Sequence, residues 1–114
     1  MPHFILDCSE NILEKQNPRK VIEAVFETAF STSLFDRDDI KVRLNPYKYS
    51  LVQSEEADFI HVFGNIMQGR TADQKAELSR EIVVTLSRLF PEVPVISINI
   101  RDFDKASYFN KSMI

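Results

Sequence analysis

The chain has 114 residues, of which 44% are hydrophobic and 27% are charged, a composition typical of one globular domain. Its net charge of -3 provides no basic surface, and no apolar run approaches the ~18 residues of a membrane span, so neither nucleic acid nor a membrane is an expected partner. A single cysteine, Cys8, excludes an intrachain disulfide and, with no recognisable signal peptide, fits a cytoplasmic protein.

The first predicted element is a strand over residues 2–8, which are apolar and β-prone. It opens on Pro2, a small residue of the kind before which initiator methionine is usually removed. Removal of Met1 would leave a secondary amine with a pKa near ~7.7–8.0, which burial or nearby cations lower further. Such an amine suits proton transfer, whereas with Met1 attached the Pro2 nitrogen is an amide and not a base. The alternative is a proline that merely starts a strand, with its missing N–H facing solvent.

A helix is predicted to begin at Asn17-Pro18, where asparagine is the N-cap and proline lies in the first turn. It should fade by about Ser31. Within it, Ile22, Phe26, Ala29 and Phe30 recur at helical spacing, flanked by Val21 and Val25, and we expect the stripe Ile22-Phe26-Phe30 to face the core.

Residues 40–44 alternate apolar and charged side chains, which predicts a strand, and Asn45-Pro46 is expected to bend or end it. Lys41 and Arg43 lie two positions apart in this strand and therefore share one face. Two cations on one face can bind a carboxylate, although from spacing alone a solvated strand face is the simpler interpretation.

The second half repeats this plan. Residues 59–67 predict another strand, which Gly69-Arg70 breaks. Thr71 and Gln74 form a capping box at the start of a second helix. The apolar stripe of this helix should lie in the core and includes Leu78, Ile82 and Leu86. Residues 95–100 predict the last strand, which a tail follows.

In order, the elements make two β-α-β pseudo-repeats, about 2–52 and 58–103, followed by a C-terminal tail over 104–114. A right-handed crossover makes the two strands of each unit parallel. The expected fold is α+β: a two-layer single domain over residues 1–114, with a four-stranded mixed sheet and both helices on one face. Apolar positions on the uncovered face need other copies of the chain to cover them, so we expect an oligomer.

The opening segment Pro2–Ile12, PHFILDCSENI, closely resembles the start of the 5-carboxymethyl-2-hydroxymuconate Δ-isomerases, members of the tautomerase superfamily that use an amino-terminal proline. Further counterparts follow in order over most of the chain, at Leu34-Phe35, Ile40–Arg43, Gly69-Arg70 and Phe109. Separately, residues 69–81 resemble the strand-to-helix turn of 4-oxalocrotonate tautomerase, a single short β-α-β unit. The longer isomerases look like a fusion of two such units, so the resemblance implies a tautomerase-like fold.

The resemblance also implies a cofactor-free, metal-free isomerase that forms a homotrimer in the cytoplasm. Its substrate would be an unsaturated 2-oxo or 2-hydroxy di- or tricarboxylate such as 5-carboxymethyl-2-hydroxymuconate, from homoprotocatechuate degradation, a route of aromatic compound catabolism. Two alternatives stay open. One is another activity of the superfamily, decarboxylation or dehalogenation, and the other is a non-catalytic trimeric interaction protein.

By the same resemblance, Pro2 is the general base that moves the proton. Lys41 stands where both related families have an arginine for the carboxylate and carbonyl end of the substrate, and Arg43 has its own counterpart in the isomerase family. Lysine keeps the charge but loses the planar fork that grips a carboxylate through two bonds. Arg70, just before a helix N-terminus, matches an arginine that binds a substrate carboxylate. Its alternative is an ordinary exposed arginine.

Phe109 lies in the C-terminal segment that, in the related trimers, reaches a neighbouring subunit and helps line the pocket, with a frayed terminus as an equal alternative. His3 matches the isomerase family without a clear role, and we expect it, like His61, to be satisfied by local hydrogen bonds. Neither histidine has a partner at ligand spacing, so no metal site is predicted.

Overall fold

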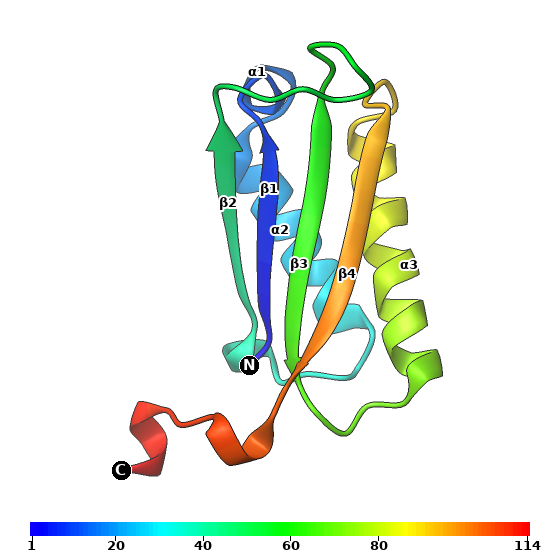
Figure 1. Cartoon of the computed structure of the whole chain (residues 1–114). Helices are drawn as coiled ribbons and strands as arrows, with labels where there is room; N and C mark the ends of the chain where they lie inside the picture. Colours follow the sequence, from blue (N-terminus) through cyan, green and yellow to red (C-terminus); the bar gives the residue numbers. More distant parts are fainter.

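Both edges of the first strand, β1 (His3–Ser9), are paired, so the N-terminal segment lies inside the sheet. In a computed structural model that describes residues 1–114, β1 is parallel to β2 (Lys41–Tyr47) and antiparallel to β3 (Phe59–Met67). In turn, β3 is parallel to β4 (Val95–Phe103). The strand order β2-β1-β3-β4 forms the four-stranded mixed sheet predicted from the sequence (Figure 1).

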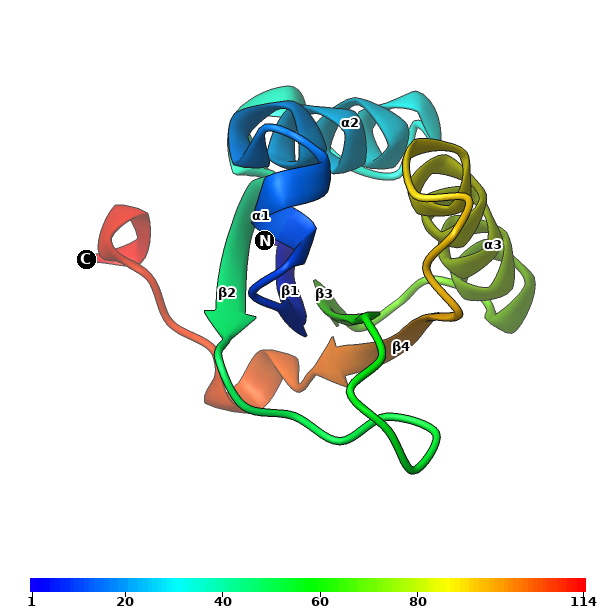
Figure 2. The same cartoon turned by 90° about the horizontal axis from the view of Figure 1, so that it is seen from above.

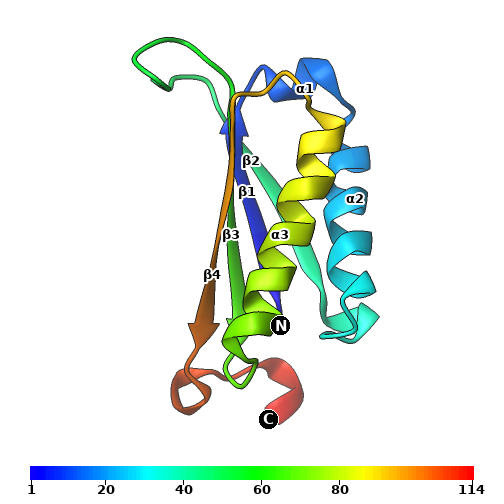
Figure 3. The same ribbon diagram turned by 90° about the vertical axis from the view of Figure 1, so that its right-hand side faces the viewer.

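Helices cover one face of this sheet and leave the other face open (Figure 3). The two long helices, α2 (Pro18–Ser31) and α3 (Ala72–Leu89), lie side by side, and the hydroxyls of Thr28 and Thr85 form a hydrogen bond of 2.7 Å between them. A four-residue helix that was not predicted, α1 (Ile12–Lys15), leads from β1 to α2. The arrangement confirms the two-layer α+β fold, and none of its helices has the length and apolar character needed to cross a membrane.

The predicted starts of both long helices are confirmed. The Asn17 side chain caps α2 by accepting a hydrogen bond from the backbone N–H of Arg19 at 2.8 Å. At α3, the Thr71 N–H donates to the Gln74 side chain at 2.9 Å, and the Gln74 N–H donates to the Thr71 hydroxyl at 3.1 Å. These reciprocal bonds fix the start of α3 directly after Gly69-Arg70.

The prediction that Ile22, Phe26 and Phe30 form the stripe in the core is wrong, although Phe26 packs against the margin of the core. The first two are only partly buried, and Phe30 is 40% exposed. The stripe that packs in the core lies one position earlier and consists of Val21, Val25 and Ala29. One residue corresponds to a rotation of about 100° on a helix, and the smaller side chains allow closer packing against the sheet. In α3 the predicted stripe is confirmed, since its three fully buried residues are Leu78, Ile82 and Leu86.

Two strands run further than predicted. β2 continues through Asn45-Pro46, contrary to the expected bend. The Lys41 N–H donates to the Pro2 carbonyl at 3.0 Å, and alternate residues of this edge strand direct their backbone groups away from β1, so the missing N–H of the proline falls on the free edge. β4 continues to Phe103 because β3 offers it a partner as far as Met67.

One end of the sheet brings together the segments that contain the predicted site. β1 and β2 begin there, β3 and β4 end there, and α3 begins there (Figure 1). A 3-10 turn, η1 (Arg37–Asp39), leads into β2 at the same end. The C-terminal tail leaves from this end through η2 (Lys105–Ser107) and η3 (Lys111–Met113) and projects from the body of the chain (Figures 1 and 2).

Candidate active site

The head of β1 holds a buried proline next to a terminal amine. Pro2 is buried, and its carbonyl accepts the backbone hydrogen bond from Lys41. Met1 is attached in this structure, so the free amine belongs to Met1, one residue before the nitrogen that would be free in a processed chain. Its pKa is lowered, first by burial and then by the hydrogen bond and positive charge of Lys41, with Asp39 acting in the opposite direction. The surroundings therefore favour the neutral form of this terminal amine.

Lys41 and Arg43 lie on the same face of β2, as predicted, and both are exposed. The register places Lys41 opposite His3 and Arg43 opposite Ile5 in β1. The Lys41 ammonium donates to the Asp39 carbonyl at 2.6 Å, and the Arg43 Nη1 donates to His3 Nδ1 at 3.0 Å. Neither cation forms a salt bridge with a carboxylate, so both are available to an anionic ligand.

His3, whose role the sequence left open, lies at the centre of this group. Its ring bonds to Arg43 and meets Phe103 edge-on, with the ring centroids 6.2 Å apart. Phe103 in turn packs against Tyr108 of the tail at 5.8 Å. The pKa of His3 is lowered, first by burial and then by the charges of Arg43, Lys41 and the terminal amine. The lowered pKa keeps the imidazole neutral at pH 7.

Arg70 lies between Gly69, whose φ of +120° supplies the turn, and the capped start of α3. Its guanidinium, however, bonds to the backbone of its own chain. It donates to the carbonyls of Leu34 and Met67, the latter at 3.4 Å, and lies 5.1 Å over the ring of Phe35. These contacts tie Arg70 to its own chain, and the Phe35 ring in turn meets Phe4 of β1 edge-on, with the ring centroids 6.1 Å apart. Its predicted role in carboxylate binding stays a prediction.

Replacing Arg70 with alanine is expected to lower the free energy of unfolding by about 1–3 kcal/mol. The change leaves two backbone carbonyls without their donor and removes the cation above Phe35. Urea unfolding followed by circular dichroism measures the loss. Arg80→Ala is the matched control: Arg80 is 69% exposed and pairs with Glu81 of the same helix, so its loss should cost under about 0.5 kcal/mol. Equal stability of the two variants would contradict the structural role.

Phe109 is 70% exposed and lies in the projecting tail (Figure 1). Its predicted place in the pocket of a neighbouring subunit stays a prediction, because the structure holds one chain. The base of the tail is anchored by the contact between Phe103 and Tyr108, and the Asn110 amide donates to the Tyr108 hydroxyl at 3.1 Å. The first contact holds Tyr108 against the end of β4, and the second orders the tail locally around Phe109.

Sequence reasoning missed Arg101, which lies on the same open face as Lys41. The register joins one residue from each strand into a single row, and this row consists of Lys41, His3, Asn65 and Arg101. The sequence contained a signal for this residue. Polar side chains alternate with apolar ones along the last strand, at Ser97 and Asn99, and Arg101 continues this alternation past the predicted end of the strand. The open face therefore has a third cation near the Pro2 end of the sheet.

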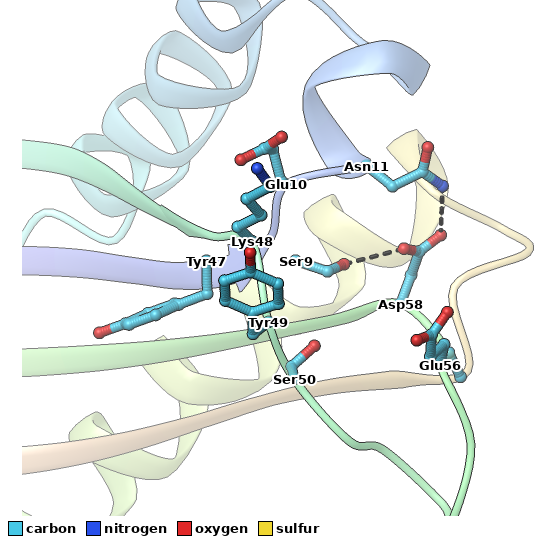
Figure 4. Close-up of a pocket in the computed structure, with 10 residues that line it drawn as sticks. Ser9, Glu10, Asn11, Tyr47, Lys48, Tyr49, Ser50, Glu56 and Asp58 are labelled. Atoms are coloured by element: carbon cyan, nitrogen blue, oxygen red, sulfur yellow. Dashed lines mark hydrogen bonds between the residues drawn. The ribbon is translucent and has the colours of Figure 1, made fainter.

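The largest hollow in the surface lies at the opposite end of the sheet (Figure 4). Its volume is about 750 Å³, and it is lined by residues that follow β1 and by part of the loop that precedes β3. Its carboxylate Asp58 is already satisfied: it accepts from the Ser9 hydroxyl at 2.9 Å and from the Asn11 amide at 3.0 Å, and the Lys15 ammonium lies 3.8 Å away. This network holds the loops together. We therefore place the candidate active site at the other end of the sheet, at the head of β1.

A family model described as 5-carboxymethyl-2-hydroxymuconate isomerase matches residues 2–114. A solved 5-carboxymethyl-2-hydroxymuconate isomerase from Deinococcus radiodurans R1 is 23% identical, with a TM-score of 0.82 over 96% of this chain and 88% of that one. A fused 4-OT, described as a wild-type symmetric trimer, is 14% identical, with a TM-score of 0.80 over 96% and 91%. N1, described as a member of the cis-3-chloroacrylic acid dehalogenase family, is 15% identical, with a TM-score of 0.75 over 96% and 80%. No curated protein sequence matches the chain significantly.

Proposed function

This chain belongs to the 5-carboxymethyl-2-hydroxymuconate isomerase family and is an isomerase, and we propose that the amine of Pro2 is its general base. The proposed substrate is an unsaturated 2-oxo or 2-hydroxy di- or tricarboxylate such as 5-carboxymethyl-2-hydroxymuconate. The observation that supports this proposal most is the head of β1, where the Pro2 carbonyl bonds to the backbone of Lys41, and burial and Lys41 lower the pKa of the terminal amine of Met1. An amine in that setting is neutral enough to accept a proton at pH 7.

The proposed reaction is a proton transfer in two halves that balance. The neutral Pro2 amine takes a proton from the substrate and becomes an ammonium, while the substrate becomes a dienolate whose negative charge rests on oxygen. The ammonium then returns the proton to another carbon, which restores the amine and gives the isomer without a net change of atoms. A single group with a pKa near the working pH can perform both halves.

Lys41 and Arg43 are proposed to bind the substrate's carboxylate and to stabilise the dienolate oxygen. Their positions on one exposed face, with no acidic partner, support this role. Lys41 acts as a point charge, whereas Arg43 has the planar fork that binds a carboxylate through two bonds. Arg70 and Phe109 are proposed to complete the pocket when subunits assemble.

The proposal includes a cytoplasmic homotrimer in which the open face of the sheet is covered by other copies. Apolar side chains on that face, among them Phe63 at 38% exposure, support burial by a partner. Two similar structures are described as symmetric trimers. We further propose that residues 1–114 act as one domain whose pseudo-repeats, 2–52 and 58–103, are chemically unequal, since only the first opens on a proline.

A substrate panel tests the reaction class. Chains free of Met1 should isomerise 5-carboxymethyl-2-hydroxymuconate with a kcat/KM at least about 10²-fold above their kcat/KM for dehalogenation of cis-3-chloroacrylate or for decarboxylation of a 2-oxo-dienoate. Initial rates from ultraviolet absorbance measure the first, and chloride or carbon dioxide release measures the others. The second candidate is one of these other superfamily activities, which the lysine at position 41 makes possible. A higher kcat/KM for either would establish it instead, and no turnover at all would favour an interaction protein.

A further inference from the structure

His3 contacts Arg43, one of the two cations on the exposed face of β2. The Arg43 Nη1 donates to His3 Nδ1 at 3.0 Å across the parallel pair β1 and β2. The same imidazole packs edge-on against the Phe103 ring, with the ring centroids 6.2 Å apart and the ring planes at 73° to each other. A ring held by Arg43 of β2 on one side and by Phe103 of β4, beyond β3, on the other has little freedom to turn, so Nδ1 stays directed at Arg43.

The surroundings of His3 fix its protonation state. The groups that face it from β2 are Lys41 and Arg43, and the terminal amine adds another positive charge. β3 contributes the uncharged Asn65 as register partner, and β4 contributes Phe103 and, in the same row of the open face, the cation Arg101. No carboxylate forms a salt bridge with the ring. The imidazole is therefore neutral at pH 7, and a bond from Arg43 requires the tautomer in which Nδ1 accepts and Nε2 bears the hydrogen.

We propose that His3 is a positioning residue: as a neutral acceptor it holds one N–H of Arg43 and aims the remaining guanidinium donors at the substrate's carboxylate. An arginine on an exposed strand face otherwise samples many rotamers, and holding one of them before the substrate arrives reduces the entropy lost on binding. Lys41 offers only a point charge, so the orientation of the carboxylate depends on Arg43. This inference rests on the proposed function, because it assigns Arg43 a carboxylate substrate.

Two substitutions separate this role from simple packing. His3→Leu removes the acceptor, whereas His3→Asn places an amide oxygen near the position of Nδ1. In chains free of Met1, the leucine variant should raise KM about tenfold with kcat within about threefold, and the asparagine variant should stay within about threefold of wild type in both. His61→Asn is the matched control, since that ring bonds to the Ser97 hydroxyl at 2.7 Å, and it should change neither parameter. Urea unfolding verifies that all variants are folded.

The pH dependence of KM is a readout that packing alone would not change. Protonation of His3 converts its acceptor into a donor and places a positive charge beside Arg43. The KM of wild type should therefore rise as the pH falls through the lowered pKa of His3, which lies below 6.5. His3→Asn has no group that titrates there and should lack this rise. An asparagine variant with the same rise, or a leucine variant with unchanged KM, would overturn the proposal.

Binding without turnover makes the test independent of the reaction. Calorimetry with cis,cis-muconate, an unsaturated dicarboxylate, measures the Kd for wild type and for the three variants. We expect binding about tenfold weaker in His3→Leu and close to wild type in His3→Asn. This order in the absence of any isomerisation would refute the proposed function and support the role of His3. Equal affinity in all four proteins, or no binding to wild type, would overturn the inference itself.

Discussion

Replacing Pro2 with alanine is expected to lower kcat for isomerisation by about 10²-fold or more, within the range of about 10²–10⁴ that general acid–base catalysis contributes. Alanine at this position also permits removal of Met1, so the variant keeps a free amine. That amine is primary and no longer fixed by a ring, so a small residual rate should remain. Initial rates on 5-carboxymethyl-2-hydroxymuconate, with the N-terminus verified by mass spectrometry, measure the effect.

Pro18→Ala is the matched control for this substitution. Pro18 opens α2 at the end of the sheet remote from Pro2, and the Asn17 cap does not depend on it, so kcat should stay within about twofold. Preparations that mix chains with Met1 and chains without it provide a second control. Their rate per chain should follow the fraction that lacks Met1, because an amide nitrogen accepts no proton. Equal rates for wild type and Pro2→Ala, or full activity in chains that retain Met1, would refute the assignment.

The sequence allowed the head of β1 to be predicted because topology alone brings its parts together. A crossover that makes β1 and β2 parallel places the starts of both strands at one end, and spacing places Lys41 and Arg43 on one face. The destination of the Arg70 side chain could not be predicted in this way. Its acceptor at Leu34 is 36 residues away in the sequence, and such a contact depends on how α2 and α3 pack. The bond between Arg43 and His3 depended on rotamers that no pattern reveals.

The fold shows the same limit in α2. Two apolar stripes exist one residue apart, and hydrophobic periodicity alone does not choose between them. The stripe with the larger side chains was the expected one, but the sheet packs against the smaller Val21, Val25 and Ala29. Phe30 lies instead under the guanidinium of Arg37, at 5.0 Å. In α3 a single stripe exists beside a capping box, so the prediction there had no competitor.

Replacing Val25 with aspartate is expected to lower the free energy of unfolding by about 3–5 kcal/mol, a large part of the total stability of a typical domain. Val25 is fully buried in an apolar cluster, where a carboxylate would lose its hydration. Burial raises the pKa of such a carboxyl, so the penalty should shrink as the pH falls toward about 4, where the group is neutral. Urea unfolding at pH 7 and pH 5 measures both the loss and its pH dependence.

Phe30→Asp is the matched control and tests the rotation of α2 directly. Phe30 is 40% exposed, and a carboxylate there can pair with Arg37, so the expected loss is about 1 kcal/mol. If the predicted stripe were the buried one, Phe30→Asp would be the more damaging change. Because α2 leads through η1 into β2, such a rotation would also displace the strand that places Lys41 and Arg43 beside β1. Comparing the free energies of unfolding of the two variants therefore tests how α2 packs, and with it the position of the strand that contains Lys41 and Arg43.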